Sequence, residues 1–215
     1  MIKAFIFDID GTLIDTNQLH IDSWIKAFKE FGVTVARSDI QLQLGRRATE
    51  IAKTLLPREK EGYVDSIVDR KRIIFREHFS EIKVFPMVKE LFGFLSSKAI
   101  KIALATSTTR HDAEFYVGLM SVESFVDGLI AAEDILHSKP DPEIFMKCAE
   151  LLGVKPHESV AIGDSTHDIL ASVRAGMIPV GVLTGGYSRE ELLKTGADKV
   201  YRDIADLYNH IGDIL

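Results

Sequence analysis

Two aspartates, Asp8 and Asp10, stand at the end of the first apolar run of the chain, and Gly11 and Thr12 follow them. In an extended strand, residues i and i+2 point to the same side and lie about 6.5–7 Å apart. Two carboxylates that converge in this way repel each other unless a cation neutralises them or one takes up a proton. Gly11 allows a tight departure from the strand, and Thr12 offers a hydroxyl and a backbone N–H. The pattern predicts carboxylate chemistry at this point.

Further polar residues follow or separate the later apolar runs: Thr106 and Ser107, Lys139, and Asp164 and Asp168. Carboxylate oxygens suit Mg²⁺ better than zinc or copper. A magnesium ion, a lysine and hydroxyl or amide donors together neutralise a phosphoryl group during its transfer. A carboxylate that the metal leaves free can attack phosphorus. Each residue alone would also fit a helix cap, but the ordered set indicates phosphoryl-transfer chemistry.

Short apolar runs are expected to form the strands that position these residues, at 2–8, 100–106, 125–132, 159–164 and 178–183. Helix-like segments separate them, and Ser188-x-x-Glu191 reads as a capping box at the start of one helix. Short strands that alternate with helices predict an α/β fold with a mostly parallel sheet and helices on both faces. In such sheets the ligand site lies beyond the carboxyl ends of the strands.

One region breaks the alternation. From Thr16 to about Val84 the sequence shows no convincing strand, only segments with helical periodicity at 17–31, 38–55 and 59–79. Crossover helices within one domain are one interpretation, but a crossover needs only a dozen or more residues. The excess length favours a separate helical insertion over the carboxyl edge of the sheet. The predicted organisation is a catalytic core of residues 1–15 and 85–215 with a helical cap domain of residues 16–84.

Four segments carry a resemblance to a known family: FDIDGT (7–12), ATS (105–107), SKPDP (138–142) and GDSTHD (163–168). In this order they resemble the four motifs of the haloacid dehalogenase superfamily. The resemblance spans essentially the whole chain, including a helical cap inserted after the first strand of a Rossmann-like core. It implies that Asp8 is the nucleophile that forms an aspartyl-phosphate. It also implies that Asp10 protonates the leaving oxygen and later activates water.

The same resemblance implies roles for the other motif residues. Thr106 and Lys139 would bind the phosphoryl oxygens. The Mg²⁺ ligands would be Asp8, the carbonyl of Asp10 and Asp164, with Asp168 in support. Members of the superfamily that dehalogenate lack the second aspartate, because a halide leaving group needs no proton. The presence of Asp10 therefore favours phosphoryl transfer.

Substrate specificity is expected to come from the insertion and its contact with the core. His20 and Trp24 lie four residues apart on one helical face, a spacing that fits packing but also resembles the caps of sugar-phosphate phosphatases and β-phosphoglucomutases. Arg46 and Arg47 follow Gly45 and could meet an anionic substrate, or could simply be solvated. Lys71, by resemblance to related caps, would point toward the substrate. The predicted substrate-binding set is Gly11, Thr12, Ser107, His20, Arg46, Arg47 and Lys71.

Two activities are compatible with this scaffold, a phosphatase and a sugar-phosphate mutase. Sugar-phosphate mutases of the superfamily typically carry valine after the glycine of the first motif and a Gly-Val-Ser-Arg cap loop, whereas this chain has Thr12 and Gly-Arg-Arg. GDSTHD and Gly185-Gly186 resemble the phosphoglycolate phosphatases. We therefore predict a Mg²⁺-dependent phosphatase of small phosphomonoesters. The alternatives are a β-phosphoglucomutase-like mutase and a non-catalytic module that binds phosphate ligands.

Composition restricts the partners. The 215 residues contain 26 Lys and Arg against 32 Asp and Glu, which gives a net charge of −6. The chain therefore lacks the excess of basic residues that is typical of a nucleic-acid binder. No apolar run approaches the ~20 residues that span a bilayer. The single cysteine, Cys148, allows no intrachain disulfide and no cysteine-rich zinc site. We expect a cytoplasmic protein, monomer or homodimer, whose partner is a small phosphate ester and neither nucleic acid nor membrane.

Overall fold

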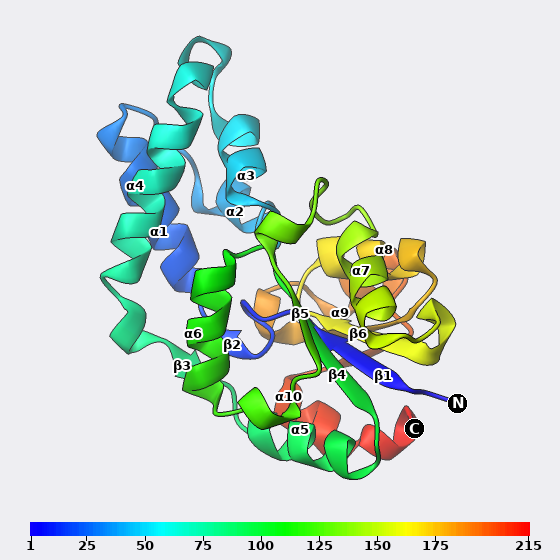
Figure 1. Cartoon of the computed structure of the whole chain (residues 1–215). Helices are drawn as coiled ribbons and strands as arrows, with labels where there is room; N and C mark the ends of the chain where they lie inside the picture. The colour runs from blue at the N-terminus through cyan, green and yellow to red at the C-terminus, as the bar shows by residue number, and fades with distance from the viewer.

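A six-stranded sheet forms the centre of the computed structural model, which describes residues 1–215 (Figure 1). Its order is β5-β4-β1-β6-β7-β8, and every neighbouring pair is parallel. In that order the strands are Gly128–Ile130, Lys101–Ala105, Ala4–Phe7, Ser159–Gly163, Ile178–Val182 and Lys199–Tyr201. The predicted α/β class with a Rossmann-like parallel sheet is confirmed.

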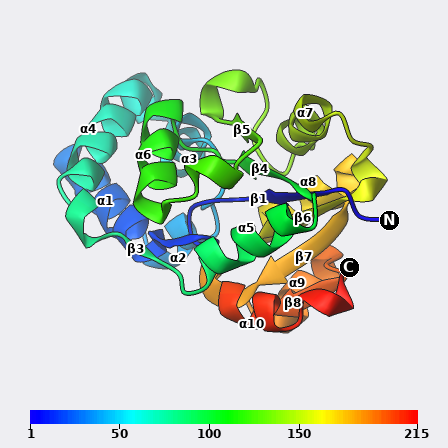
Figure 2. The same ribbon diagram turned by 60° about the horizontal axis from the view of Figure 1, so that its bottom comes forward.

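Helices cover both faces of the sheet (Figure 2). Phe5 and Phe7 point to one face, where they pack in a hydrophobic cluster with residues of α5, α6 and α10. Ala4 and Ile6 point to the other face, against α7 and α8. The helices of the first face are α5 (Val88–Ser97), α6 (Arg110–Met120) and α10 (Ile204–Asn209); those of the second are α7 (Glu143–Leu152), α8 (Thr166–Ala175) and α9 (Arg189–Thr195). All four β1 side chains are buried, which explains why the run reads as continuously apolar.

Residues 16–82, which we call the helical insertion, lie beyond the carboxyl end of β1 (Figure 1). They connect two short antiparallel strands, β2 (Ile14–Asp15) and β3 (Lys83–Val84). The insertion contains α1 (Asn17–Glu30), α2 (Arg37–Gln41), α3 (Ala48–Leu55) and α4 (Val64–Arg76). Its apolar side chains, with Trp24 and Phe28 among the largest, form a hydrophobic cluster separate from those of the sheet.

The structure differs from the expected elements mainly in its short helices and short strands. Helical periodicity predicted one segment over 38–55, but residues 42–47 form a loop between α2 and α3. Gly45 has a φ of +88° in that loop, a left-handed conformation that is not part of a helix and that glycine adopts without strain. The segment expected at 59–79 consists of a 3₁₀ turn at Arg58–Tyr63 followed by α4. Strands β2, β3 and β8 were not predicted, because two or three residues carry too little periodicity.

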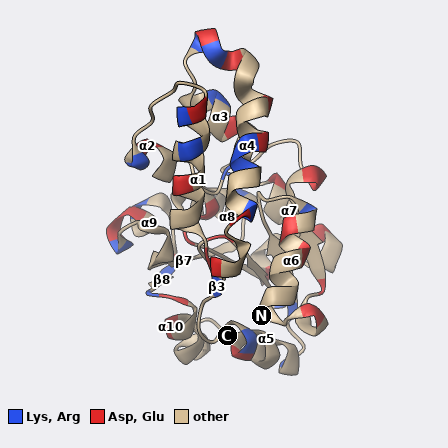
Figure 3. Ribbon diagram, turned by 90° about the vertical axis from the view of Figure 1, so that its left-hand side faces the viewer, with Lys and Arg blue, Asp and Glu red and all other residues tan.

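Short 3₁₀ helices complete the chain at Arg58–Tyr63, Phe79–Glu81, Glu123–Phe125, Ala132–Asp134, Pro156–Glu158, Leu183–Gly185 and Ile211–Asp213. The predicted capping box is present, because the Ser188 hydroxyl accepts from the Glu191 N–H at the start of α9. None of the helices combines the length and the apolar character that crossing a membrane requires. Acidic and basic positions are interspersed along the helices of the insertion (Figure 3).

Candidate active site

Asp8 emerges from β1 at the centre of the sheet, between the ends of β4 and β6. Its side chain is buried, and both of its oxygens are bonded. The Lys139 ammonium donates to Oδ1 at 2.6 Å, and the Thr12 hydroxyl donates to Oδ2 at 3.2 Å. Burial raises the pKa of Asp8 to about 7, because the loss of water outweighs the attraction of Lys139. The geometry holds this carboxylate in one orientation.

Lys139 is fully buried and connects three groups. Besides Asp8, its Nζ contacts the Ala105 carbonyl at 2.9 Å and Asp168 Oδ1 at 2.7 Å. Burial alone would lower the pKa of Lys139, but the two carboxylates outweigh it and raise the pKa above the ordinary value. Asp168 is fixed in turn by the hydroxyl and the N–H of Ser165 at the start of α8. The ammonium is therefore charged and held in place.

Three carboxylates, those of Asp8, Asp164 and Asp168, bring oxygens within 4.8 Å of one another. The Asn17 amide donates to Asp164 Oδ2 at 2.7 Å. Burial, reinforced by Asp168 and Asp8, raises the pKa of Asp164 well above its ordinary value. One lysine cannot balance three buried carboxylates, so the cluster lacks positive charge. An all-oxygen set of this kind fits Mg²⁺.

Gly11 is required where the chain turns away from Asp8. Its φ is +75°, and a Cβ there would lie 2.1 Å from Asp164 Oδ2 and 2.2 Å from Asn17 Nδ2. Any side chain would therefore push Asp164 and Asn17 apart. The glycine keeps the first-motif loop and the end of β6 in contact.

The carboxylate of Asp10 contacts a different set of residues from the one that holds Asp8. Its Oδ1 accepts from the Thr16 hydroxyl and contacts His20 Nε2, each at 2.9 Å. Burial would raise the pKa of Asp10, but His20 and Thr16 outweigh it and hold the pKa below its ordinary value. Asp8 and Asp10 thus have pKa values displaced in opposite directions.

Lys71 of α4 completes a chain of polar contacts to Asp10. Its Nζ lies 2.7 Å from His20 Nδ1, and the His20 ring stacks on Phe75 with centroids 4.1 Å apart. Burial and the nearby Lys71 lower the pKa of His20, and burial lowers that of Lys71 to about 8. A neutral ring that accepts from Lys71 at Nδ1 carries its proton on Nε2 and donates it to Asp10. Lys71 and His20, both in the insertion, therefore orient the Asp10 carboxylate of the core.

A cavity of about 100 Å³ lies between the insertion and the strand ends. Predicted site residues in its lining are Asp8, Asp10, His20, Arg46, Lys71, Thr106 and Ser107. Those outside the lining are Gly11, Thr12, Arg47, Lys139, Asp164 and Asp168. Pockets that bind drug-sized ligands measure roughly 300–1,000 Å³, so this cavity suits a smaller molecule.

Several predicted substrate-binding groups already have protein partners. The Ser107 hydroxyl donates to the Gly45 carbonyl at 2.7 Å, and the Thr106 hydroxyl accepts from the Thr108 N–H at 3.1 Å. Arg46 is paired with Glu50 at 3.0 Å. Arg47 points to the core instead, where it contacts the backbone carbonyls of residues 135 and 136. Substrate binding by these side chains stays a prediction.

Four polar residues at the site were not singled out from the sequence: Thr16, Asn17, Glu50 and Asp112. Thr16 and Asn17 directly follow β2, and two helix-capping residue types in succession were the available signal. Asp112 lines the cavity and accepts from Arg76 at the end of α4. Partners of this kind lie far apart in sequence, and no local pattern connects them.

Comparison with known proteins agrees with this geometry. The model of the haloacid dehalogenase-like hydrolase family matches residues 5–182. A provisionally named pyrophosphatase PpaX from Clostridium perfringens is 36% identical over 200 residues, with 92% of both chains covered. The structure is similar to a hydrolase from Pseudomonas syringae, with a TM-score of 0.91, 28% identity and 99% of both chains covered. It is also similar to a β-phosphoglucomutase from Clostridium difficile, with a TM-score of 0.83, 26% identity, and coverage of 99% of this chain and 100% of that one.

Proposed function

The chain belongs to the haloacid dehalogenase-like hydrolase family, and we propose that it hydrolyses small phosphate compounds through an aspartyl-phosphate on Asp8. One observation carries the proposal. Asp8 and Asp10 line one cavity but are held by different groups, Asp8 by Lys139 and Thr12 and Asp10 by Thr16 and His20, and their pKa values are displaced in opposite directions, Asp8 upward and Asp10 downward. Carboxylates separated in this way take different roles, here nucleophile and general acid–base. Residues 16–84 act as a cap domain in this proposal, supported by their separate hydrophobic cluster.

In the first step an Asp8 oxygen attacks phosphorus, and the bond from phosphorus to the leaving oxygen breaks. Asp10 gives its proton to that oxygen. An anionic substrate raises the pKa of Asp10, because a nearby like charge disfavours the ionised form, so the carboxylate is protonated when a proton is needed. In the second step water attacks the phosphoryl group, Asp10 takes the water proton, and phosphate leaves with Asp8 regenerated.

The other motif residues hold and neutralise the transferred group. The Lys139 ammonium, fixed by Asp168, lies beside the attacking carboxylate and holds it; its three donors are taken by Asp8, Asp168 and the Ala105 carbonyl, so it binds a phosphoryl oxygen only by exchanging one of these bonds. Thr106 at the end of β4 offers a further donor on the cavity wall. Mg²⁺ would be held by Asp8, the Asp10 carbonyl and Asp164, with Asp168 in support, and would neutralise negative charge on the phosphoryl oxygens. The three clustered carboxylates support this assignment.

The substrate is proposed to be inorganic pyrophosphate or an ester with a leaving group of a few heavy atoms. The small cavity and the pyrophosphatase name of the Clostridium perfringens relative support this class. Arg46 and Lys71 in the cavity lining supply positive charge for an anionic leaving group. A sugar-phosphate mutase is the second candidate, which the similarity to a β-phosphoglucomutase supports. A non-catalytic module is disfavoured, because no acid, base or lysine of the motifs is missing.

Phosphate release from a panel of substrates tests the proposal. The panel contains pyrophosphate, phosphoglycolate, p-nitrophenyl phosphate, hexose 6-phosphates, β-glucose 1-phosphate and nucleotides, each with Mg²⁺. We expect the highest kcat/KM for pyrophosphate or phosphoglycolate and at least about tenfold less for the hexose phosphates, whose leaving groups are larger. Conversion of β-glucose 1-phosphate to glucose 6-phosphate in the presence of a bisphosphate primer, without phosphate release, would instead establish the mutase.

Lys71→Met is expected to stabilise the protein and to lower its activity. Burial lowers the pKa of Lys71 from 10.5 to about 8, and each unit corresponds to about 1.4 kcal/mol. After subtraction of the lost bond to His20, the free energy of unfolding at pH 7 should rise by about 1–3 kcal/mol. We expect kcat to fall about tenfold, because His20 loses the partner that fixes its tautomer.

Urea unfolding at pH 7 and at pH 9.5 checks this result. The folded-state pKa of Lys71 lies below the unfolded value, so the folded protein releases this proton first and wild type gains stability as pH rises from about 8 to 10.5. The stability difference between variant and wild type should therefore shrink at pH 9.5. Lys26→Met, at an exposed position of α1, should change neither stability nor kcat. A variant less stable than wild type at pH 7 would contradict the burial cost.

A further inference from the structure

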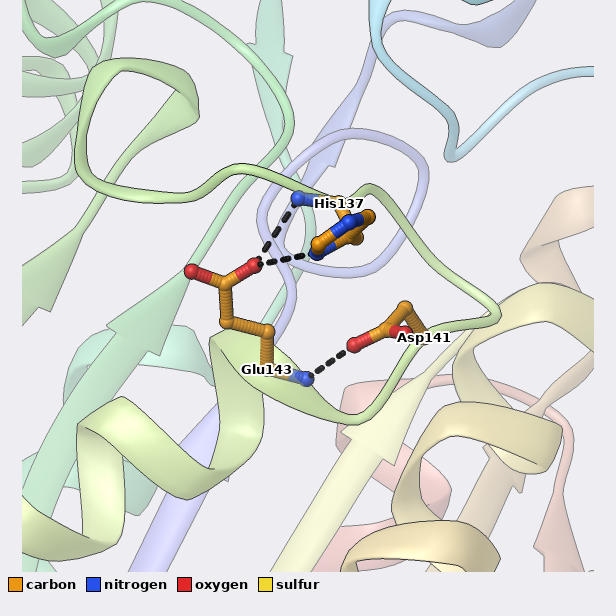
Figure 4. A group of neighbouring side chains, drawn as sticks. All are labelled: His137, Asp141 and Glu143. Carbon is orange, nitrogen blue, oxygen red and sulfur yellow. Dashed lines mark hydrogen bonds and ion pairs between the residues drawn. The ribbon is translucent and has the colours of Figure 1, made fainter.

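The loop of residues 135–138 delivers Lys139 to the site, and the core holds it from one side. Glu143 at the start of α7 accepts from the N–H of Leu136 at 3.0 Å and from that of His137 at 2.8 Å. The Glu143 N–H donates to Asp141 in turn (Figure 4). The carboxylates of Asp141 and Glu143 are thus occupied by the backbone of their own segment. They shape the loop that precedes Lys139.

The helical insertion holds the same loop from the other side. Glu50, in the first turn of α3, accepts from the buried Ser138 hydroxyl at 2.6 Å. Arg47 donates to the carbonyls of Ile135 at 3.4 Å and Leu136 at 3.3 Å. Ser138 directly precedes Lys139 in the chain. The insertion therefore contacts the segment that positions the lysine, although it does not contact the lysine itself.

The hydrogen bond between Glu50 and Ser138 is expected to be stronger than an ordinary surface hydrogen bond. The Ser138 side chain is buried, and Glu50 Oε2 also accepts from Arg46 at 3.0 Å. Burial would raise the pKa of Glu50, but the bonds from Ser138 and Arg46 outweigh it and keep the carboxylate ionised. Hydrogen bonds to a charged group are about twice as strong as neutral ones. Glu50 and Ser138 are 88 residues apart, so this bond exists only while the insertion lies against the core.

We infer that Glu50 is a positioning residue for the reaction: through Ser138 it fixes the loop that brings Lys139 to Asp8, and so couples closure of the insertion to assembly of the site. This inference rests on the proposed function. Lys139 must hold Asp8 Oδ1 at 2.6 Å, and a displacement of about 1 Å can cost about 10²-fold in rate. Closure of the insertion over the substrate thereby completes the catalytic set.

A double-mutant cycle on kcat tests the inference. Glu50→Ala and Ser138→Ala should each lower kcat about tenfold, and the double variant should lie within about twofold of either single one, because all three remove the same contact. Glu50→Gln keeps an oxygen that accepts from Ser138 but loses the charge that pairs with Arg46, and should keep at least about half of kcat. The matched control is Glu30→Gln, which breaks an ion pair with Arg70 inside the insertion and should leave kcat unchanged.

Amide hydrogen exchange reports on the loop without any turnover. In Glu50→Ala and in Ser138→Ala, but not in Glu30→Gln, exchange of residues 135–141 should be several times faster than in wild type, and faster than the change in global stability accounts for. If the kcat effects multiply, if only KM changes, or if exchange of 135–141 is unaltered, the inference is wrong. A Glu50→Gln variant as slow as Glu50→Ala would assign the effect to the pair with Arg46 instead. Absence of phosphate release by wild type would overturn the proposed function, and the exchange data would then decide the inference alone.

Discussion

Asp8→Asn is expected to lower phosphate release by a factor of at least about 10⁴ while leaving the fold intact. The amide is not a nucleophile, so no covalent intermediate can form. The surrounding structure should persist, because Lys139 keeps its contacts with Asp168 and with the Ala105 carbonyl. Release is measured with the best substrate of the panel, beside urea unfolding of both proteins.

Asp22→Asn provides the matched control for this variant. Asp22 is a half-exposed aspartate of α1 paired with Arg37, and its substitution should leave the rate within about twofold of wild type. If Asp8→Asn retained more than about 1% of the wild-type rate with an unchanged substrate preference, Asp8 could not be the nucleophile. Water attacking the substrate directly, with Asp10 as its base, would then be the simplest mechanism.

Mg²⁺ is expected to be required for activity and to stabilise the folded protein. A ligand present at 100 times its Kd adds about 2.7 kcal/mol to the free energy of unfolding, which for a chain of this length corresponds to about 5–10 °C in Tm. Chelation should abolish phosphate release and return Tm to its metal-free value. Full activity after exhaustive chelation, confirmed by metal analysis, would refute the assignment of Asp8, Asp164 and Asp168 to a metal site.

Asp164→Asn distinguishes the effect of Mg²⁺ binding from effects on the metal-free fold. Burial and two neighbouring carboxylates raise the pKa of Asp164 in the metal-free protein, so removing its charge should raise the metal-free Tm. The same variant should lose most of the Tm increase that Mg²⁺ produces, together with activity. Asn17 can still donate to the remaining amide oxygen, so the loop geometry is kept.

The metal effect should also depend on pH. Burial raises the pKa of Asp8 from 3.8 to about 7, so the folded metal-free protein holds more protons than the unfolded chain between those values. Stability contributed by this group is present at low pH and falls as pH rises through that window. Mg²⁺ competes with protons for its carboxylates, so its stabilising effect should grow from pH 5 to pH 8. Differential scanning calorimetry with and without Mg²⁺ measures both trends.

The sheet and the order of the motif residues along it could be predicted because both are local properties of the sequence. Continuous apolar runs gave the central strands, and the polar residues at their carboxyl ends had to meet at one edge. The loop at 42–47 could not be predicted in the same way. Its conformation depends on contacts with distant parts of the chain, such as the Ser107 hydroxyl on the Gly45 carbonyl and His167 on the Leu42 carbonyl.

The contacts that fix the site residues were the least predictable. Asn17 and Asp164 are 147 residues apart, and only folding brings the amide against the carboxylate. Hydrophobic periodicity likewise gives no indication of the bond between Glu50 and Ser138. Arg47 shows the opposite case: its type and position suggested an anion site, whereas in the structure it contacts backbone carbonyls of the core. A charge that follows a glycine predicts exposure to a partner, but not which partner.

The central position of β1 has a consequence for synthesis of the protein on the ribosome. Its strand partners are β4 and β6, and β6 ends at Gly163, so the segment that carries Asp8 is synthesised before both partners and can be paired on both sides only after residue 163. At about 5–20 residues per second, β1 lacks its second strand partner for about 8–30 s. Residues 17–76 pack in a hydrophobic cluster of their own and can fold during that interval. The nascent chain therefore carries a folded helical segment next to an incompletely paired, wholly apolar strand, and we expect chaperones to bind that strand during translation.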